Sequence, residues 1–455
     1  MPTTVILGGG IIGASIAYYL SDPSSASSSS PPHDIHIIDT SPRLLASASG
    51  FAAGFCAKDW FAPELSSLGE LSFALHAKLA AEQGGRGKWG YRKSKALGLR
   101  VEYADGQRSG SGHDWLTRGA SRAEVAGRKK EGEGEGDGSP AWLTRQRGGV
   151  VERISDDGST AQVDPLRLSQ WLLDRCTERD VRMHYPARAV SFTTDPSTGN
   201  TTAIQIQHLG TQTTTTLPCT HLVFAAGVWT PSVFTTLFPS STAKIPILSL
   251  SGYSLLFRSP RHTLADEKQR YAGDTHAVFT THPRSCGFSP EIFSRAGAEI
   301  YIAGLNSSEV PVPRIATEAN TVFDPKQMEK VKHAAVTLMG KRLAEGRKDS
   351  VRGVDEQNDG TPPIDDLEIL REGLCFRPWT ESGLPIIGRI DERIQDLGGK
   401  GVPVGGVYMA TGHGPWGISL ALGTGKVVAE TVRGEKTSAD VSGLGFVERG
   451  GKARL

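Results

Sequence analysis

VILGGGIIG, residues 5–13, is the stretch that decides the fold of this chain. An apolar run leads into a G-x-G-x-x-G motif made by Gly8, Gly10 and Gly13, and a helix-like segment continues to Leu20. In this motif the first glycine permits a tight turn, the second lets backbone approach a pyrophosphate, and the third lets the helix pack on the strand. The helix N-terminus then stabilises the anion. The stretch therefore predicts a buried strand, a phosphate-binding turn and a helix.

An acidic residue accompanies this motif. A second predicted strand, residues 35–38, ends at Asp39, which is placed to accept hydrogen bonds from a ribose 2′-OH. Asp39 follows Gly13 by 26 residues (39 − 13), more than the usual ~20, and the serine-rich insertion at 21–32 accounts for the excess. An acid here disfavours a 2′-phosphate, so FAD or NAD fits better than NADP. The alternative is a glycine-rich turn that holds no ligand.

Size and charge narrow the classes of function. With 455 residues, the chain is expected to form two lobes, or one core with a large second layer. Its 50 Lys and Arg against 49 Asp and Glu leave a formal charge of +1. No single-sign field is then available to bind nucleic acid or an anionic membrane, and a small-molecule partner is expected.

Cysteine spacing and hydropathy exclude further classes. The five cysteines lie tens of residues apart without zinc-like spacing, so we expect neither a disulfide framework nor a metal site. The N-terminus lacks the basic region of a secretory signal, and no run reaches 18 apolar residues. We therefore expect a soluble intracellular protein without a transmembrane segment.

Five further segments carry a resemblance to a known superfamily. They are SASGFAAG (47–54), VDPLRLSQWLL (163–173), HLVFAAGVW (221–229), FRPWTESGLPIIG (376–388) and ATGHGPWGISLALGTGKVVAE (410–430). In this order they resemble motifs of the D-amino-acid oxidase, glycine oxidase and sarcosine oxidase superfamily of FAD-dependent oxidoreductases. Residues 54–60 and 289–313 look most like a little-characterised fungal and plant subgroup of it.

The resemblance implies an α/β fold with two lobes, a Rossmann-like FAD-binding lobe and a second, mainly antiparallel-sheet substrate lobe. We predict the FAD lobe in 1–60, 150–232 and 373–435, the substrate lobe in 61–149 and 233–372 with a low-complexity insertion near 104–148, and a tail at 436–455. The residues expected to bind FAD are Gly8, Gly10, Ile11, Ile12, Gly13, Asp39, Thr40, Ser49, Gly50, Ala53, Gly54, Ala226, Gly227, Trp229, Cys375, Gly412, Gly414, Pro415, Trp416 and Gly417.

The resemblance also implies a reaction, the dehydrogenation of a C–N bond in an amine or amino acid. A hydride passes to flavin N5, the imine hydrolyses, and O2 reoxidises the flavin to give hydrogen peroxide. Arg377 of the R-P pair is expected to hold the substrate carboxylate, and its alternative role is an ordinary ion-paired arginine.

Three other residues are candidates for the catalytic centre. Lys58 and His413 are expected to supply positive charge near the isoalloxazine, although a lysine on a loop is usually solvated and the histidine could be structural. Trp416 stands roughly where sarcosine oxidases carry a carboxylate-binding lysine, so it is expected to line the pocket or to belong to the core.

Cys375 lies two positions before Arg377, where sarcosine oxidases and amadoriases attach FAD through a thioether. Those enzymes lack the R-P pair found here. We therefore expect non-covalent FAD, with Cys375 as a buried free cysteine. The alternative is a thioether link between FAD and Cys375.

The last three residues, Ala453-Arg454-Leu455, resemble a small-basic-leucine peroxisomal address, which a peroxisomal import receptor would read. The resemblance thus favours a peroxisomal oxidase whose partners are its substrate and O2, with a cytoplasmic or endosome-associated protein as the alternative location. Two other functions stay open. One is a FAD dehydrogenase with a carrier protein or quinone as acceptor, and the other is a flavoprotein acting in endosomal or membrane traffic.

Overall fold

The computed structural model of the chain describes residues 1–25, 32–101, 138–144, 146, 149–281, 286–342, 363–394 and 401–446. Most of the insertion predicted near 104–148 lies outside the described residues, and so does the predicted address at 453–455.

The described elements include both helices and strands, and several strands follow one another without a helix between them. The strands are β1 (Thr3–Leu7), β2 (Asp34–Ile38), β3 (Phe55–Ala57), β4 (Arg92–Val101), β5 (Gly149–Arg153), β6 (Thr160–Gln162), β7 (Arg182–His184), β8 (Ala187–Thr194), β9 (Thr201–His208), β10 (Thr214–Pro218), β11 (His221–Phe224), β12 (Leu248–Arg258), β13 (Thr275–Thr281), β14 (Glu291–Arg295), β15 (Glu299–Ser307), β16 (Lys341–Arg342), β17 (Pro363–Ile364), β18 (Glu368–Trp379), β19 (Ile386–Arg389) and β20 (Val407–Thr411). The α-helices are α1 (Ile11–Ser21), α2 (Ala48–Phe51), α3 (Pro63–Gln83), α4 (Gly85–Lys88), α6 (Pro165–Glu178), α7 (Thr230–Leu237), α8 (Leu264–Gln269), α9 (Pro325–Met339) and α10 (Gly417–Val432).

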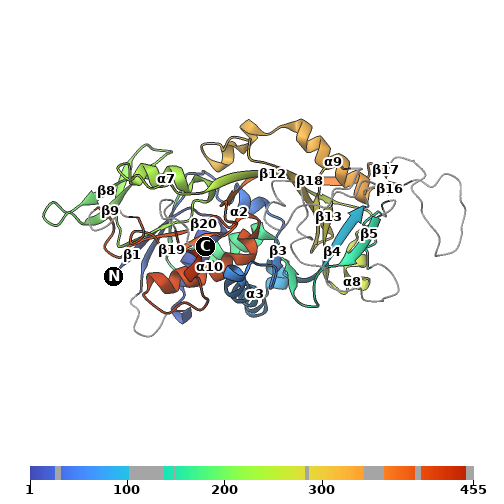
Figure 1. Cartoon of the computed structure of the whole chain (residues 1–455), viewed down its shortest axis with the longest axis horizontal. Coiled ribbons are helices and arrows are strands. Elements are labelled where there is room, and N and C mark those ends of the chain that lie inside the picture. Colours follow the sequence, from blue (N-terminus) through green and yellow to red (C-terminus); the bar gives the residue numbers. More distant parts are fainter. Residues whose placement is uncertain are drawn as a thin grey trace, which may run out of the picture.

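A parallel sheet holds the motif that decides the fold. Its strand order is β19-β20-β11-β1-β2-β7. Strands β1, β19 and β20 of this sheet are labelled in Figure 1. The strands from β20 to β7 run parallel, and β19 pairs with β20 antiparallel. The predicted strand, turn and helix at 5–20 are therefore confirmed as β1 and α1.

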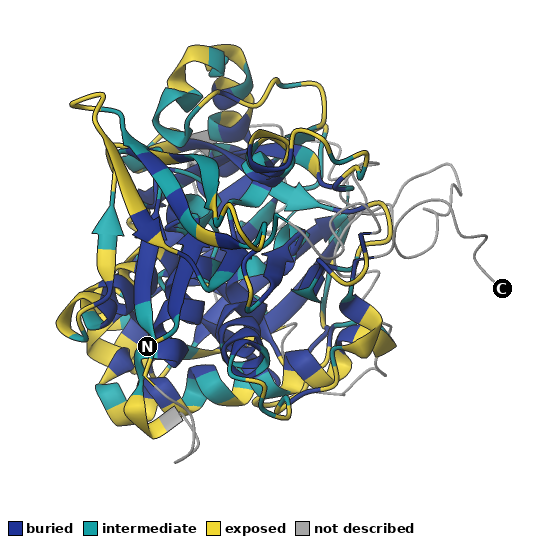
Figure 2. Cartoon of the chain, turned by 90° about the vertical axis from the view of Figure 1, so that its left-hand side faces the viewer, coloured by how far each residue is buried: buried dark blue, intermediate teal, exposed yellow. Residues whose placement is uncertain are grey.

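Both faces of this sheet are covered by apolar layers. On one face Ile6 packs with residues of α1, α3, α6 and α10. On the other face Val5 and Leu7 pack with α7 and the small β8-β9-β10 sheet. Because neighbouring strand residues alternate between faces, a strand covered on both sides needs a continuous apolar run. Figure 2 shows the buried residues gathered in these layers and the exposed ones on the surrounding loops and outer helix faces.

A second, larger sheet has the order β18-β12-β15-β14-β13-β4-β6-β3, with β5 paired to β4. Its neighbours are antiparallel except β4 and β13, which run parallel. Helix α9 covers one part of it through the apolar cluster that contains Val331 and Leu338. The predicted α/β fold class with a second, mainly antiparallel sheet is confirmed.

The predicted lobe boundaries stay a prediction. The large sheet includes strands β3 and β6, which belong to segments that we assigned to the FAD lobe. Among the described residues, no helix is both long enough and apolar enough to cross a membrane.

Candidate active site

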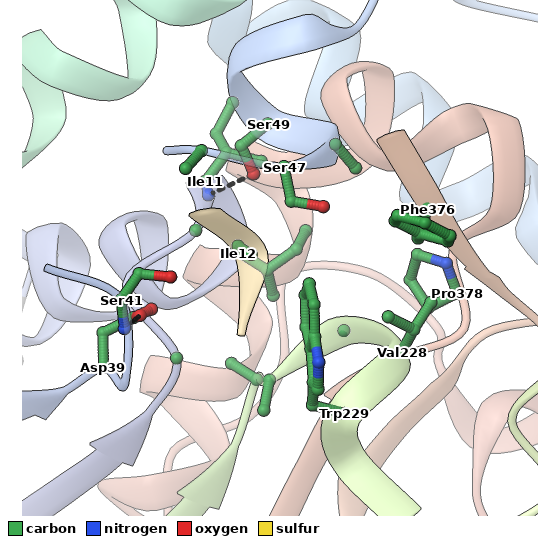
Figure 3. Close-up of a pocket in the computed structure, with 18 of the residues that line it drawn as sticks. Ile11, Ile12, Asp39, Ser41, Ser47, Ser49, Val228, Trp229, Phe376 and Pro378 are labelled. Atoms are coloured by element: carbon green, nitrogen blue, oxygen red, sulfur yellow. Dashed lines mark hydrogen bonds between the residues drawn. The ribbon is translucent and has the colours of Figure 1, made fainter. Parts of the chain in front are cut away.

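A cavity of about 820 Å³ lies between the carboxyl ends of the parallel strands and one face of the large sheet. Gly8, Asp39 and Ala225, which directly follow strands β1, β2 and β11, line the cavity, and so does His413, two residues after the end of β20. Carboxyl ends of parallel strands meet at one edge of a sheet, which is where α/β folds bind ligands. Figure 3 shows residues of several elements converging on this cavity.

The turn after β1 has a backbone that a ligand can approach closely. Gly8 has φ +117°, and a Cβ there would lie 2.4 Å from the Ala225 carbonyl oxygen. Helix α1 begins after Gly10, which provides no side-chain cap. The Ile11 N–H donates to Ser49 Oγ at 2.9 Å (Figure 3), and both Gly10 and Ile12 line the cavity. Ser49 thus takes up the first N–H of the helix, and the following N–H groups at the helix start, beside a turn without side chains, fit a pyrophosphate.

Asp39 stands at one end of the cavity. Its carboxylate accepts the N–H of Gly9 and the N–H of Ser41, each at 2.8 Å. Burial raises the pKa of Asp39, and the two backbone hydrogen bonds oppose this rise. Each carboxylate oxygen keeps acceptor capacity for a ribose hydroxyl. The predicted neighbour Thr40 also lines the cavity.

Residues that the sequence left unassigned complete this end. Residues 187–190 of β8 line the cavity, and the Ala187 N–H donates to the Asp39 carbonyl at 2.8 Å. The composition of β8 does not indicate a binding strand. Strand β8 lines the cavity because it lies beside β2.

Most of the remaining predicted FAD ligands also line the cavity. Trp229 lies opposite Ile12 in Figure 3, and its Nε1–H donates to the Pro313 carbonyl at 2.8 Å. If Asp39 binds the ribose, the isoalloxazine belongs at the opposite end of the cavity, beside Phe376 and Pro378 (Figure 3), and we call this the isoalloxazine end. The other predicted residues that line the cavity are Ala53, Gly54, Ala226, Gly227, Trp229, Cys375, Gly414, Pro415 and Gly417.

Three predicted glycines shape the walls without lining the cavity. A Cβ on Gly13 would lie 2.0 Å from the Gly8 carbonyl oxygen, and one on Gly50 would lie 2.1 Å from that of Leu45. Gly412 has φ +81° in the turn after β20. These glycines keep the turns compact, and the contact with FAD that we expected of them stays a prediction.

Trp416 and Lys58 are not brought into the cavity either. Trp416 packs edge-on against Phe61, with ring centroids 4.9 Å apart, so it belongs to the core. Lys58 is exposed and does not line the cavity. The positive charge that we expected from Lys58 is thus absent from this site, because a long charged side chain without a buried partner remains in water.

His413 lines the cavity but is uncharged. It is buried, and its Nε2 lies 3.0 Å from Thr424 Oγ1. Burial lowers the pKa of His413 to about 3, so the ring is neutral at pH 7. The expected positive charge at His413 is therefore corrected to a neutral, hydrogen-bonded imidazole.

This neutral ring predicts an acid sensitivity. Because the pKa of His413 falls from 6.5 to about 3 on folding, the unfolded chain binds the proton first as the pH drops. The stability that depends on the neutral ring is complete above pH 6.5 and is lost progressively toward pH 3. Between pH 7 and 4.5 the free energy of unfolding should therefore fall by roughly 2 kcal/mol less in His413→Gln than in the wild type.

Thermal melts of the cofactor-free chain across this pH range check the prediction. The exposed His333, changed to Gln, is the control and leaves the pH dependence of Tm as in the wild type. Parallel Tm curves for wild type and His413→Gln would contradict a buried neutral ring.

Arg377 reaches the cavity from β18 with a partner that sequence reasoning missed. Its Nη1 donates to Asn306 Oδ1 at 2.6 Å. Gly252, on the strand between them, leaves the space for this pair, since a Cβ there would lie 2.7 Å from Nη1. A guanidinium held by one side chain retains further donors for a carboxylate.

A local distortion brings Asn306 to this position. Leu305 has φ +51°, and the pairing of β12 with β15 shifts register between Ser251 and Tyr253. A bulge of this kind re-aims side chains that would otherwise alternate regularly. Strand periodicity alone therefore gave no signal for Asn306.

Cys375 is a buried free thiol in the same wall. Burial raises its pKa, and the nearby Arg377 and Arg371 oppose the rise. Tyr301 and Glu291, from β15 and β14, also line the cavity and were not predicted. Among the described residues, no cluster of His, Cys, Asp and Glu is arranged to hold a metal ion.

Comparisons with known proteins agree with this geometry. The family model "FAD dependent oxidoreductase" matches residues 3–431. A Schizosaccharomyces pombe protein described as an oxidoreductase is 26% identical over 456 residues, which cover 96% of each chain.

Two solved structures share the fold at lower identity. Glycine oxidase from Geobacillus kaustophilus superposes with a TM-score of 0.65 at 19% identity, covering 99% of this chain and 100% of that one. Iminodiacetate oxidase from Chelativorans sp. BNC1 gives a TM-score of 0.63 at 17% identity, covering 98% and 99%.

Proposed function

Because the chain belongs to the family of FAD-dependent oxidoreductases, we propose that it oxidises the C–N bond of an amine or amino acid that carries a carboxylate. The observation that carries this proposal is Arg377, a guanidinium held at 2.6 Å by Asn306 in the wall of the cavity. Glycine oxidase and iminodiacetate oxidase, both named for carboxylated amines, share the fold and so support the substrate class.

Bound FAD supplies the acceptor for a hydride from the substrate carbon. The side chains of this protein orient that carbon and exclude water. Arg377 binds the carboxylate at a fixed place in the large sheet, so the adjacent carbon is turned toward the isoalloxazine end. Val228, Phe376 and Pro378 lie together on this side of the cavity (Figure 3) and provide an apolar wall. Water exclusion strengthens the charge pairing at Arg377.

A peroxidase-coupled screen tests the function. The purified holoprotein is offered D- and L-amino acids, N-methyl amino acids and glycated amines, and peroxide formation with at least one carboxylated amine is expected. Anaerobic bleaching without peroxide in air would instead indicate a dehydrogenase with another acceptor. Absence of bleaching with every class would overturn the enzymatic proposal and favour a flavin-binding scaffold.

Gly252 offers a selective test of how Arg377 is held. The atoms nearest to a Cβ in Gly252→Ala are the ends of two side chains, at 2.7 Å for Arg377 Nη1 and 2.8 Å for Asn306 Oδ1. The guanidinium therefore moves while the backbone stays. We expect kcat/KM to fall roughly 10- to 100-fold through KM, as for a lost hydrogen bond to a charged group, with Tm nearly unchanged.

Steady-state kinetics and thermal melts separate these effects, and Asn306→Ala should give the same pattern. A Gly252→Ala protein with unchanged KM would show that the Arg377–Asn306 pair does not position substrate.

We further propose that FAD is bound without a covalent link, because a buried thiol with a raised pKa is a poor nucleophile. Acid precipitation should release all the flavin, and flavin retained in the pellet would indicate a thioether at Cys375.

The proposed location is the peroxisome, where a peroxide-forming oxidase would meet catalase. The support is the Ala453-Arg454-Leu455 terminus. A fluorescent protein carrying this tail should enter peroxisomes, and removal of Leu455 should leave it in the cytosol. Unchanged localisation would exclude the address.

A further inference from the structure

Four consecutive backbone carbonyls, those of residues 50–53, accept hydrogen bonds from the large sheet. Arg371 Nη1 donates to the Gly50 carbonyl at 3.0 Å, and the Tyr301 hydroxyl donates to that of Phe51 at 2.7 Å. Arg295 Nη2 donates to the next two carbonyls at 2.6 and 2.7 Å, and its Nε adds a bond of 3.1 Å to the second. We call Arg295, Arg371 and Tyr301 the carbonyl clamp.

Arg295 is the unusual member of this clamp, because it is a buried cation. Its exposed fraction is 3%, and its guanidinium stacks on the Tyr301 ring at 4.7 Å. In the described part of the chain it donates to carbonyls and forms no ion pair within 4 Å, and the more distant carboxylates of Asp164 and Glu299 offset part of its charge. Arginine stays protonated even when buried. Burial of this guanidinium costs desolvation free energy, which points to a function for its charge.

The clamp lies behind the cavity wall on the side of Cys375 and Arg377, whose charges act on Tyr301. Ala52 and Ala53, whose carbonyls Arg295 holds, line the cavity, and Tyr301 lines it as well. The charge is therefore separated from a bound ligand only by one backbone segment and one ring. Charges at such a separation still interact strongly where water is excluded.

The positions at which we expected positive charge do not provide it, since Lys58 is exposed and His413 is neutral. We propose that Arg295, assisted by Arg371, supplies the positive potential at the isoalloxazine end and thereby favours reduction of the bound FAD. Uptake of a hydride, two electrons with one proton, adds one negative charge to the cofactor, and this charge is attracted by the clamp. Arg295 is thus a positioning and electrostatic residue that acts through the 50–53 segment.

The inference depends on FAD binding but not on the substrate proposed above. It is tested by measuring the two-electron midpoint potential of the bound FAD by dye equilibration, without substrate. Arg295→Gln retains an N–H donor for the carbonyls and removes the charge. At a fixed redox poise we expect about a tenfold shift of the ratio toward oxidised FAD, which equals about 30 mV for a two-electron couple.

Two further variants separate charge from structure. Arg295→Lys retains the charge and should keep the potential near that of the wild type, even where it weakens FAD affinity. Arg371→Gln, at a half-buried position, should shift the ratio about threefold in the same direction. The control is Arg261→Gln, because Arg261 binds Asp366 at 2.7 Å, lies outside the cavity lining and should leave the potential unchanged.

Equal potentials in wild type, Arg295→Gln and Arg371→Gln would overturn the proposal. If Arg295→Gln does not retain FAD, an unchanged potential in Arg371→Gln overturns it, and a lowered potential supports it. A negative substrate screen leaves these results intact, because dyes and not substrates reduce the cofactor.

Discussion

Arg377→Met lowers kcat/KM for carboxylated amines by roughly 100- to 1,000-fold, the largest catalytic loss that we expect in this protein. The variant keeps the volume of the side chain but removes the fork that binds the carboxylate. Loss of one partner of a desolvated, hydrogen-bonded charge pair costs about 3 to 4 kcal/mol, which gives this range of rates. Asn306, which accepts from Arg377 at 2.6 Å, is then left without its cationic partner.

The measurement is steady-state kinetics on a substrate and on its neutral analogue, in which an amide replaces the carboxylate. The analogue should be turned over equally by wild type and variant. Arg258→Met is the matched control, since Arg258 lies at the far end of the same strand pair in a surface contact with Glu368. A similar loss for the analogue would show that Arg377 does not act through the carboxylate.

Gly8→Ala abolishes tight FAD binding, with a loss in affinity of about 100-fold or more. The residue has φ +117°, and a Cβ would lie 2.4 Å from the Ala225 carbonyl oxygen and 2.9 Å from the Ala226 Cα. These are backbone atoms held by the β1–β11 pairing, so they cannot move aside as a side chain does. Backbone strain alone costs of order 1 to 3 kcal/mol, and displacement of the turn separates the pyrophosphate from the start of α1.

Quenching of FAD fluorescence gives the affinity, and thermal melts of the cofactor-free protein give the stability. Gly87→Ala is the matched control, because a Cβ at Gly87 has no atom within 4 Å. That variant should bind FAD as the wild type does. Unchanged FAD affinity in Gly8→Ala would contradict the assignment of this turn to the pyrophosphate.

The cofactor end of the site could be predicted from the sequence because it depends on short-range geometry. Gly8, Gly10 and Asp39 lie next to the ends of strands that can be recognised in the sequence by their apolar runs. Parallel pairing brings the carboxyl ends of these strands to the same edge of the sheet. Backbone approach and a strand-end carboxylate are properties of a few consecutive residues. Ala226 and Gly227, predicted from the resemblance of residues 221–229 to a flavin-binding strand, also line the cavity.

The electrostatics and the substrate end were decided by tertiary structure. Gly252, Asn306 and Arg377 come from three strands that are distant in sequence, and a bulge at Leu305 turns Asn306 toward the arginine. In the sequence, nothing distinguishes Arg295 from an ordinary strand residue. Its role depends on the packing of the large sheet against the carbonyls of Ala52 and Ala53.

The FAD-binding turn and the fold class thus follow from short stretches of the amino-acid sequence. Whether each charged or titratable side chain is buried, paired or solvated was decided only by the packing of segments far apart in the chain. Lys58 in water and His413 held neutral in the core are both results of that packing, because ionisation depends on the surroundings of a group and not on its neighbours in the sequence.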